Sequence, residues 1–288
     1  MMFVRKWRSE MSISQAEKGK RFRALHEGPG TFVIPNPSNA GTARILASLG
    51  FKALATTSAG VAFSLGRRDG AGLVSCEETL EHAREMVEAS DLPVSADLEK
   101  CFGDEPEVVA ETIRKAAAVG LVGGSVEDAT GDPNRPIYDH VLAVERVAAA
   151  VAAARALPFP FVVVGRAENF LHGRADLKDT IRRLEAYAEA EADVLFAPGL
   201  PDLDAIRTVC AAVAPRAVNV LAGGKGSGLT VANLATAGVR RISVGSALTR
   251  AAFGAFLRGA REIAEKGTFT FGDDAASFAE ISEFMSER

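Results

Sequence analysis

Residues 93–128, PVSADLEKCFGDEPEVVAETIRKAAAVGLVGGSVED, contain the pattern that decides the fold. Two short runs at 93–97 and 122–128 are largely apolar, as strands of a buried parallel sheet are. Between them, Glu105–Val119 places apolar residues three and four positions apart, which predicts an amphipathic helix. A strand, a helix and a second strand in this order predict two parallel strands joined by a crossover helix.

The same alternation extends over nearly the whole chain. Six further short apolar runs occur at 31–35, 53–57, 161–166, 193–197, 217–221 and 241–245. Helical periods follow the runs at Thr42–Leu49, Glu77–Ala89, His140–Ala154, Leu177–Glu191, Asp202–Ala214, Thr230–Ala237 and Leu248–Glu265. Eight strand–helix units predict an α/β fold of the (β/α)₈ TIM-barrel type. An open, doubly wound sheet is the alternative, although it usually has fewer strands.

No linker or low-complexity segment interrupts this alternation, so we expect one domain over residues 1–288. The barrel should occupy about residues 30–266, after an N-terminal helix at about 12–26. A helical C-terminal extension should follow at 267–288. Gly50, Gly120 and Gly238 come directly after helical stretches, where a left-handed cap residue is expected.

The composition narrows the class of protein. Hydrophobic residues make up 48% and charged residues 24% of the chain, which is typical of a globular protein and excludes intrinsic disorder. The formal net charge of −4 argues against nucleic acid as a partner. No apolar run approaches the roughly 18 residues of a membrane span, so no membrane partner is expected. Three scattered cysteines without a CxxC pair indicate a reducing, cytoplasmic location.

Acidic residues follow two neighbouring predicted strands. Asp97 and Glu99 come at the end of the third strand, and Glu127 comes at the end of the fourth. Because the carboxyl ends of barrel strands meet at one mouth, these carboxylates should lie together and repel one another unless a cation lies among them. An all-oxygen set favours Mg²⁺, or Mn²⁺, with one direct carboxylate and others bound through water. Ordinary solvated acids at strand ends are the alternative.

Other polar residues are predicted to face the same mouth. Arg166 ends the apolar run FVVVG and can either stabilise a developing enolate or form a structural ion pair. The stretch Ser58-Ala59-Gly60 can offer backbone N–H groups to a carboxylate, unless it is only a tight turn. Asn219 lies in the seventh strand, and Asp69 lies in the loop GRRDGAG, where a simple turn aspartate is the plainer interpretation.

The glycine-rich stretch GGKGSG at 223–228 suggests a different chemistry. Loops after the seventh and eighth strands are the common phosphate site of such barrels, and Lys225 would add a positive charge. A flavin or sugar-phosphate enzyme that uses this loop is therefore a rival hypothesis. A flexible loop without a ligand is the simpler interpretation of the same glycines.

Six stretches of the sequence, taken together, resemble those of a known enzyme family. They are VIPNPSNAGTARILASLGF, TTSAGVAFSLGRRDG, PVSADLE, GGSVEDATGD, GRAENFL and GVRRISVGSALTRAA, spread over about residues 30–255. This set resembles the isocitrate lyase/phosphoenolpyruvate mutase superfamily, and above all its small single-barrel members of the phosphonomutase or methylisocitrate-lyase type. The resemblance implies a Mg²⁺-binding (β/α)₈ barrel that exchanges its last helix between subunits and forms a homotetramer, a dimer of dimers. It also implies small 2-oxo or 2-hydroxy acid substrates, with a C–C or P–C bond cleaved or formed through a metal-bound enolate.

The resemblance also implies roles for individual residues. Asp97 matches the direct metal ligand, and Glu99 and Glu127 match acids that hold the metal's waters. Arg166 matches the arginine that binds the reacting group, and Asp69 matches an acid near the metal. The stretch Ser58-Ala59-Gly60 matches the loop that grips the substrate carboxylate. The full set comprises Arg166, Glu127 and Asp69 for catalysis, Ser58, Ala59, Gly60 and Asn219 for the substrate, and Asp97, Glu99 and Glu127 for the metal.

This chain departs from the family patterns at three places. The Cys- and His-containing loop of the lyases is replaced by DATGDPNR at 128–135, so the proton donor for C–C cleavage is not identified. The phosphonomutase loop's Lys and Asn-Ser pair is not evident either. The usual Gly-Tyr-Gly is Cys101-Phe102-Gly103, and the usual Trp-Asp is Ser38-Asn39.

Together these observations predict a Mg²⁺-dependent lyase acting on a small 2-oxo or 2-hydroxy dicarboxylic acid. Cleavage of a C–C bond or decarboxylation, as in an oxaloacetate-decarboxylase-like reaction, needs fewer acid and base groups than the missing loop supplies. The loop at about 129–138 would act as a lid. The alternatives are a phosphonomutase, a phosphate- or flavin-binding barrel, and a non-catalytic member of the family.

Overall fold

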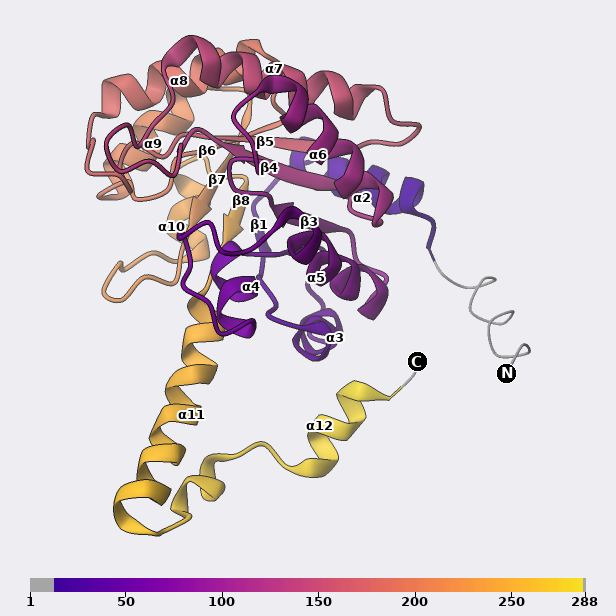
Figure 1. The fold of residues 1–288 in the computed structure, drawn as a ribbon, viewed down its shortest axis with the longest axis vertical. Coiled ribbons are helices and arrows are strands. Elements are labelled where there is room, and N and C mark those ends of the chain that lie inside the picture. Colours follow the sequence, from indigo (N-terminus) through magenta and orange to yellow (C-terminus); the bar gives the residue numbers. More distant parts are fainter. Residues whose placement is uncertain (1–12, 287–288) are drawn as a thin grey trace.

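Eight parallel strands form a nearly closed barrel in the computed structural model, which describes residues 13–286 (Figure 1). The strands are β1 (Phe32–Ile34), β2 (Leu54–Ala55), β3 (Val94–Asp97), β4 (Gly123–Glu127), β5 (Val162–Arg166), β6 (Val194–Phe196), β7 (Ala217–Leu221) and β8 (Arg241–Ser243). They lie in the order β1-β8-β7-β6-β5-β4-β3-β2. This arrangement confirms the predicted (β/α)₈ fold over the open-sheet alternative.

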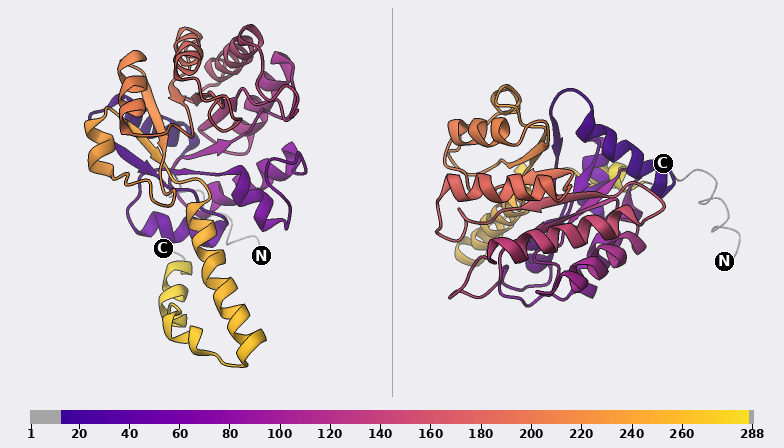
Figure 2. Two further views of the ribbon diagram at one scale, coloured as in Figure 1. Left: turned by 90° about the vertical axis from the view of Figure 1, so that its left-hand side faces the viewer. Right: turned by 90° about the horizontal axis from the view of Figure 1, so that it is seen from above.

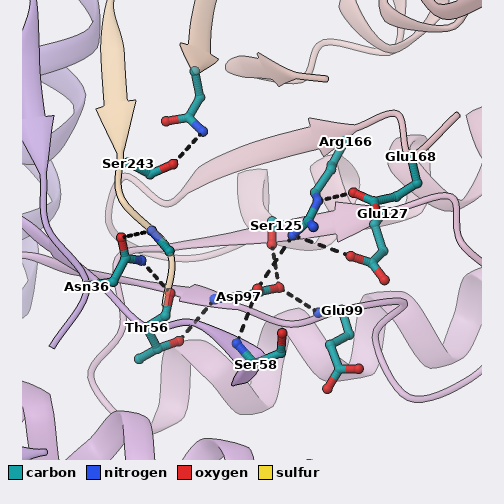
Figure 3. Close-up of polar contacts among 12 residues, drawn as sticks. Asn36, Thr56, Ser58, Asp97, Glu99, Ser125, Glu127, Arg166, Glu168 and Ser243 are labelled. Carbon is teal, nitrogen blue, oxygen red and sulfur yellow. Dashed lines mark hydrogen bonds and ion pairs between the residues drawn. The ribbon is translucent and has the colours of Figure 1, made fainter. Parts of the chain in front are cut away.

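The seam between β1 and β2 is joined by backbone and side-chain hydrogen bonds. The Ala55 N–H donates to the Pro35 carbonyl at 3.1 Å, across the seam. Asn36, just after β1, donates from Nδ2 to the Thr56 carbonyl at 2.9 Å. Its Oδ1 accepts from the N–H groups of Val244 and Gly245 at 3.0 and 2.8 Å (Figure 3). One side chain therefore ties the carboxyl ends of β1, β2 and β8 together.

Helices follow the strands and surround the barrel (Figure 2). They are α3 (Ala40–Ser48), α5 (Cys76–Ala89), α6 (Pro106–Ala118), α7 (His140–Arg155), α8 (Leu177–Glu189), α9 (Leu203–Ala212), α10 (Val231–Thr236) and α11 (Ala247–Lys266). Each predicted helix is present, with small shifts at its ends. The three predicted cap glycines, Gly50, Gly120 and Gly238, all have positive φ. None of the helices in the described part of the chain has the length and apolarity needed to cross a membrane.

One helix near the barrel mouth was not predicted. Ser58–Ser64 forms the short helix α4 directly after β2, whereas the small residues Ser58-Ala59-Gly60 predicted a loop or turn. The stretch is short and contains a glycine, so its helical pattern was too weak to detect. The N–H groups of these residues belong to the first turn of a helix, where they have no partner within the helix.

Side chains along the strands alternate between the barrel interior and the surrounding helices. On β5, Val162 and Val164 pack in the interior cluster, whereas Val163 belongs to the outer core against the helices. A Cβ at Gly165 would contact Tyr187 of α8 at 3.1 Å, so this position also faces outward. Arg166 continues the inward series of Val162 and Val164 and therefore faces the barrel interior at its carboxyl end.

Helix α2 (Gln15–Glu27) closes the opposite, amino-terminal end of the barrel. Its Phe22 is fully buried among interior side chains such as Ile34 and Val162. A Cβ at Gly123 would lie 2.8 Å from the Phe22 ring, so the ring packs directly on the first residue of β4. Because this end is plugged, a ligand can reach the interior only from the carboxyl ends of the strands.

The C-terminal extension leads away from the barrel and then returns toward it (Figure 1). A 3₁₀ helix, η1 (Thr270–Asp274), and helix α12 (Phe278–Met285) follow α11. Helix α12 packs on α3 of the same chain, where Arg44 Nη1 donates to the Met285 carbonyl at 2.8 Å. The predicted helical extension is confirmed, while exchange of this helix between subunits is a separate proposal taken up below.

Removal of the plug side chain should destabilise the barrel. We expect Phe22→Ala to lower the free energy of unfolding by about 3–5 kcal/mol, because it leaves a cavity beneath the strands. Urea denaturation followed by circular dichroism measures this change. Leu49→Ala, at a position whose side chain is 64% exposed, is the control and should change little. Equal, small effects of both substitutions would contradict the assigned role of Phe22.

Candidate active site

Polar side chains from several strands gather around a cavity at the carboxyl end of the barrel (Figure 3). The cavity has a volume of about 170 Å³. A single water needs about 10–15 Å³ of such space, so the cavity has room for a small organic acid. Its lining includes five of the predicted site residues, in addition to Asp97 itself: Ser58, Ala59, Asp69, Arg166 and Asn219.

Asp97 is the centre of the hydrogen-bond network. Its Oδ2 accepts from the Ser58 N–H at 3.3 Å, and its Oδ1 accepts from the Glu99 N–H at 3.2 Å. The Ser125 hydroxyl of β4 donates to Oδ1 at 3.4 Å. The Asp97 N–H donates to Thr56 Oγ1 at 3.1 Å, which fixes the backbone at the end of β3. The carboxylate is therefore oriented by the first turn of α4, by β4 and by the turn after β3.

Arg166 lies between three carboxylates. Its Nη1 is 3.5 Å from Asp97 Oδ2 and 3.4 Å from Glu127 Oε2, and its Nε pairs with Glu168 Oε1. Its guanidinium carbon is 5.1 Å from the centre of the Phe196 ring, on the neighbouring strand β6. Burial would lower the pKa of Arg166, but the carboxylates of Glu168, Glu127 and Asp97 outweigh it and hold the pKa above its usual range. The predicted ion pair is thus present, and the guanidinium also faces the cavity.

A buried network lies behind Arg166, and its residues were not among those predicted for the site. Glu168 is only 3% exposed, and its N–H donates to Asp128 Oδ1 at 2.8 Å. Asp128 Oδ2 also accepts from the Tyr187 hydroxyl at 2.7 Å and from Arg183 Nη1 at 3.1 Å. Glu168 and Asp128 each lie within two residues of a predicted site residue, in the charged stretches GRAEN and SVEDA. Their closeness in sequence to Glu127 and Arg166 was the signal that could have placed them near the site.

The predicted acids around Asp97 are brought together, and their pKa values are raised. Burial raises the pKa of Glu99 to about 7, with further contributions from Asp97 and Asp69. Burial also raises the pKa of Asp69, with Asp97 adding to the effect and a Ser58 hydrogen bond opposing it. Burial holds the pKa of Glu127 well above its usual range, although the charge of Arg166 acts in the opposite direction. Glu99 has a left-handed φ of +49°, and its side chain extends away from Asp97 (Figure 3).

The donor set fits a hydrated divalent cation better than a cage of carboxylates. Within residues 13–286, no three His, Cys, Asp or Glu side chains lie close enough together to hold a metal ion jointly. Buried acids with raised pKa values nevertheless repel one another, and a cation among them would offset this repulsion. Mg²⁺ typically binds one or two carboxylates and keeps several waters. Asp97 as the direct ligand, with Glu99 and Glu127 reached through water, meets that requirement.

The predicted substrate residues divide into two groups. Ser58 and Ala59 line the cavity, as does Asn219, whose Nδ2 donates to Ser243 Oγ at 3.0 Å. Gly60 is buried within α4 and is not part of the cavity lining. A Cβ at Gly60 would meet Thr57 Cγ2 at 3.0 Å, so a side chain there would disturb α4.

The glycine-rich loop at 223–228 borders a second cavity, of about 250 Å³. Gly223, Gly224 and Ser227 contribute to its wall. The other neighbours are largely apolar, for example Leu200 and Ile206, and Arg250 is the charged side chain among them. Lys225, which the rival hypothesis assigned to a phosphate, is exposed and is not in this lining.

Comparison with known proteins matches most of the chain to one family. Residues 22–264 match the family model described as phosphoenolpyruvate phosphomutase. A solved structure from Burkholderia cenocepacia, described as a lyase/mutase, is 56% identical, with a TM-score of 0.91 and coverage of 95% of this chain and 97% of that one. The 2-methylisocitrate lyase of Halalkalibacterium halodurans is 27% identical over 97% of this chain and 93% of its own length. The 2-methylisocitrate lyase of Escherichia coli is 30% identical, over 70% of this chain and 69% of its own length.

The raised pKa of Glu99 predicts a pH-dependent stability difference. The folded chain favours the protonated form of the Glu99 carboxyl, because its pKa is higher there than in the unfolded chain. The stabilisation that protonated Glu99 provides is therefore complete below about pH 4.5 and is lost as the pH rises through 7. In EDTA at pH 8.5, Glu99→Gln should therefore be more stable than the unsubstituted protein, by up to about 3 kcal/mol. The two proteins should converge below pH 5.

Urea denaturation across this pH range measures the difference. The control is Glu85→Gln on the exposed side of α5, which should show an offset that does not vary with pH. A difference between Glu99→Gln and the unsubstituted protein that stays constant from pH 5 to 8.5 would contradict the burial of an ionisable Glu99.

Proposed function

Because the chain belongs to the phosphoenolpyruvate phosphomutase family, we propose that it is a Mg²⁺-dependent lyase of small 2-oxo or 2-hydroxy dicarboxylic acids. The reaction would be cleavage of a C–C bond or decarboxylation. The observation that carries this proposal is the pairing of Asp97 with Arg166 beside a cavity of about 170 Å³. Relatives that are 2-methylisocitrate lyases support C–C cleavage as the class of reaction.

Arg166 would stabilise the negative charge that develops on the substrate when a bond next to the 2-oxo carbon breaks. Its guanidinium is held by Glu127 and Glu168 and lies over the Phe196 ring, so it needs little rearrangement during the reaction. Mg²⁺, or Mn²⁺ in its place, bound at Asp97 would supply a second positive charge next to the developing enolate. Asp69, which lines the cavity, and Glu127, which lies behind it against Arg166, would keep the surrounding waters oriented.

The substrate carboxylate would bind at the first turn of α4. Ser58 and Ala59 line the cavity there, and N–H groups at a helix start attract anions. In this proposal Gly60 acts indirectly, because its missing side chain leaves room for the Thr57 methyl group at the start of α4. Asn219, on the opposite side of the barrel interior, would contact the other end of the substrate.

The loop at 129–138 would serve as a lid over this cavity. It begins directly after Asp128 and forms a small hairpin, with an antiparallel bridge between Ala129 and Ile137. The Tyr138 N–H donates to the Asp128 carbonyl at 2.8 Å, which anchors the end of the hairpin beside Glu127. Movement of the hairpin tip would exclude water from an enolate while leaving the anchored ends in place.

A phosphonomutase is the second candidate, because the matching family model bears that description. The same Arg166 and Asp97 pair would then act on a P–C bond. Five acids separate the two activities: oxaloacetate, isocitrate, 2-methylisocitrate, 2,3-dimethylmalate and phosphonopyruvate. We expect one carboxylic acid to be cleaved with Mg²⁺ and none in EDTA, as followed by proton and phosphorus NMR.

Two variants test whether the turnover depends on Arg166. Arg166→Lys should reduce kcat by about 10²–10³-fold, since it removes the fork that contacts Glu168 and Glu127 together. Arg182→Lys, in an exposed ion pair on α8, is the matched control and should retain activity. Unchanged turnover in Arg166→Lys would overturn the role of Arg166, and turnover of phosphonopyruvate alone would favour the mutase.

The remaining outcomes identify the other candidates. A protein that binds Mg²⁺ but turns over none of the acids would indicate a non-catalytic member of the family. A bound yellow cofactor in the purified protein would support the flavin alternative at 223–228. The structure contains three free cysteines, Cys76, Cys101 and Cys210. Because thiols stay reduced in the cytoplasm, we include a cytoplasmic location in the proposal.

We also propose a homotetramer, a dimer of dimers, in which subunits exchange the last helix and α11 and α12 pack against a neighbouring subunit. Helix α11 carries large exposed apolar side chains, including Phe256, which is 72% exposed, and Leu257, which is 48% exposed. Phe278 at the start of α12 is 90% exposed. Such a concentration of apolar surface is typical of a contact between subunits.

A single charge on α11 should break this assembly. We expect light scattering after size exclusion to give the mass of four chains for the unsubstituted protein and a smaller species for Phe256→Glu. Val141→Glu, on α7 at a position whose side chain is 66% exposed, is the control and should leave the mass unchanged. A monomer in the unsubstituted protein would refute the proposed assembly.

A further inference from the structure

A second buried arginine, Arg241, lines the same cavity from the first position of β8. It is only 6% exposed. Its Nε and Nη1 have no hydrogen-bond partner within residues 13–286, and none of the ion pairs in that range includes it. The other deeply buried arginines differ in this respect, since each has carboxylate or carbonyl partners: Arg146, Arg166 and Arg183.

Strand register places Arg241 on the same interior surface as Arg166. Arg166 of β5 pairs with Phe196 of β6, Phe196 pairs with Asn219 of β7, and Asn219 pairs with Arg241. Each of these positions faces inward in the two-residue alternation of its strand. The two arginines are therefore separated along the barrel wall by Phe196 and Asn219, and both border one cavity.

The floor beneath Arg241 offers no negative charge. Its guanidinium carbon is 5.9 Å from the centre of the Phe22 ring, and the nearby His26 is neutral. Burial, with Arg241 adding its repulsion, lowers the pKa of His26 to about 3. Burial lowers the pKa of Arg241 to about 10, with Asp97 as the opposing charge, so the guanidinium still carries its proton at neutral pH.

A buried charge without a partner is costly, and an anion in the cavity would remove that cost. Ser243 lies two residues along β8 and also lines the cavity. Its hydroxyl oxygen accepts from Asn219 Nδ2, which leaves the hydroxyl proton free for an anionic ligand. Arg241 and Ser243 together offer the charged and neutral donors that a carboxylate requires.

We infer that Arg241 and Ser243 form a second anion subsite at the floor of the cavity, which binds the distal carboxylate of a dicarboxylic acid. This inference rests on the proposed function and adds the residues that bind the second carboxylate. The near carboxylate would lie at α4 and the distal one at Arg241. Selectivity for dicarboxylates over monocarboxylates would then come from β8.

Unreactive probes test this subsite without any turnover. Succinate and butyrate are four-carbon acids that differ by one carboxylate. With Mg²⁺ held constant, calorimetry should show at least tenfold tighter binding of succinate than butyrate. Arg241→Met should lose this preference, and Arg241→Gln should lose it too if the Met variant fails to fold. Arg240→Met is the matched control, because Arg240 is the preceding residue but bonds outward to the Gly30 carbonyl, and it should keep the preference.

Stability supplies a second readout. Without ligand, Arg241→Met should unfold at higher urea concentration than the unsubstituted protein, because it removes an uncompensated buried charge. Succinate should then stabilise the unsubstituted protein and not the variant. A preference that survives in Arg241→Met, or no preference in the unsubstituted protein, would overturn the inference. Stabilisation by inorganic phosphate alone, with no effect of succinate, would show an inorganic anion site and overturn the carboxylate assignment. None of these outcomes depends on which acid is turned over, so the proposed function is tested separately.

Discussion

The guanidinium of Arg166 forms ion pairs with acids from three strands, and the geometry of the cavity depends on these pairs. It contacts Asp97 from β3, Glu127 from β4 and Glu168 just beyond β5. Carboxylates this deeply buried would repel one another and take up protons without a cation between them. Asp128 accepts hydrogen bonds from Tyr187 and Arg183, and it also accepts one from the Glu168 N–H, which holds the Glu168 backbone in place. Arg166 thus offsets part of the negative charge of the site, and a buried polar network supports it.

The interior of the barrel is unevenly polar. Across β5 and β6, the lower interior is closed by Val162, Val164 and Val194. Across β7 and β8, the inward positions carry Asn219, Arg241 and Ser243. Asp97 of β3 and Ser125 of β4 line the same cavity, so a ligand with charge at both ends suits it better than one with an apolar end. Barrels of this kind vary their chemistry through such inward positions and the loops beside them.

The fold could be predicted because each strand is a short apolar run and each crossover helix has a clear period. The helix α4 could not, since Ser58–Ser64 is too short for its period to stand out. Asp97, Asp69 and Arg166 were found from strand ends and from family resemblance, and they do border one cavity. Glu168 was given no role, because its place two residues after Arg166 does not show that the two side chains form an ion pair. Arg241 stands next to Arg240 in the sequence, and only the strand register shows which of the two faces inward.

The plug formed by Phe22 also has a consequence for the kinetics of folding. This side chain belongs to the first described helix, yet its neighbours include Gly123 of β4, Val162 of β5 and Arg241 of β8. These partners are distant in sequence, and contacts between distant residues slow folding because long loops must close first. During synthesis, Phe22 would leave the ribosome long before β8 exists. The floor of the barrel can therefore be completed only at the end of translation, and until then an aromatic side chain and a helix face remain open to wrong partners.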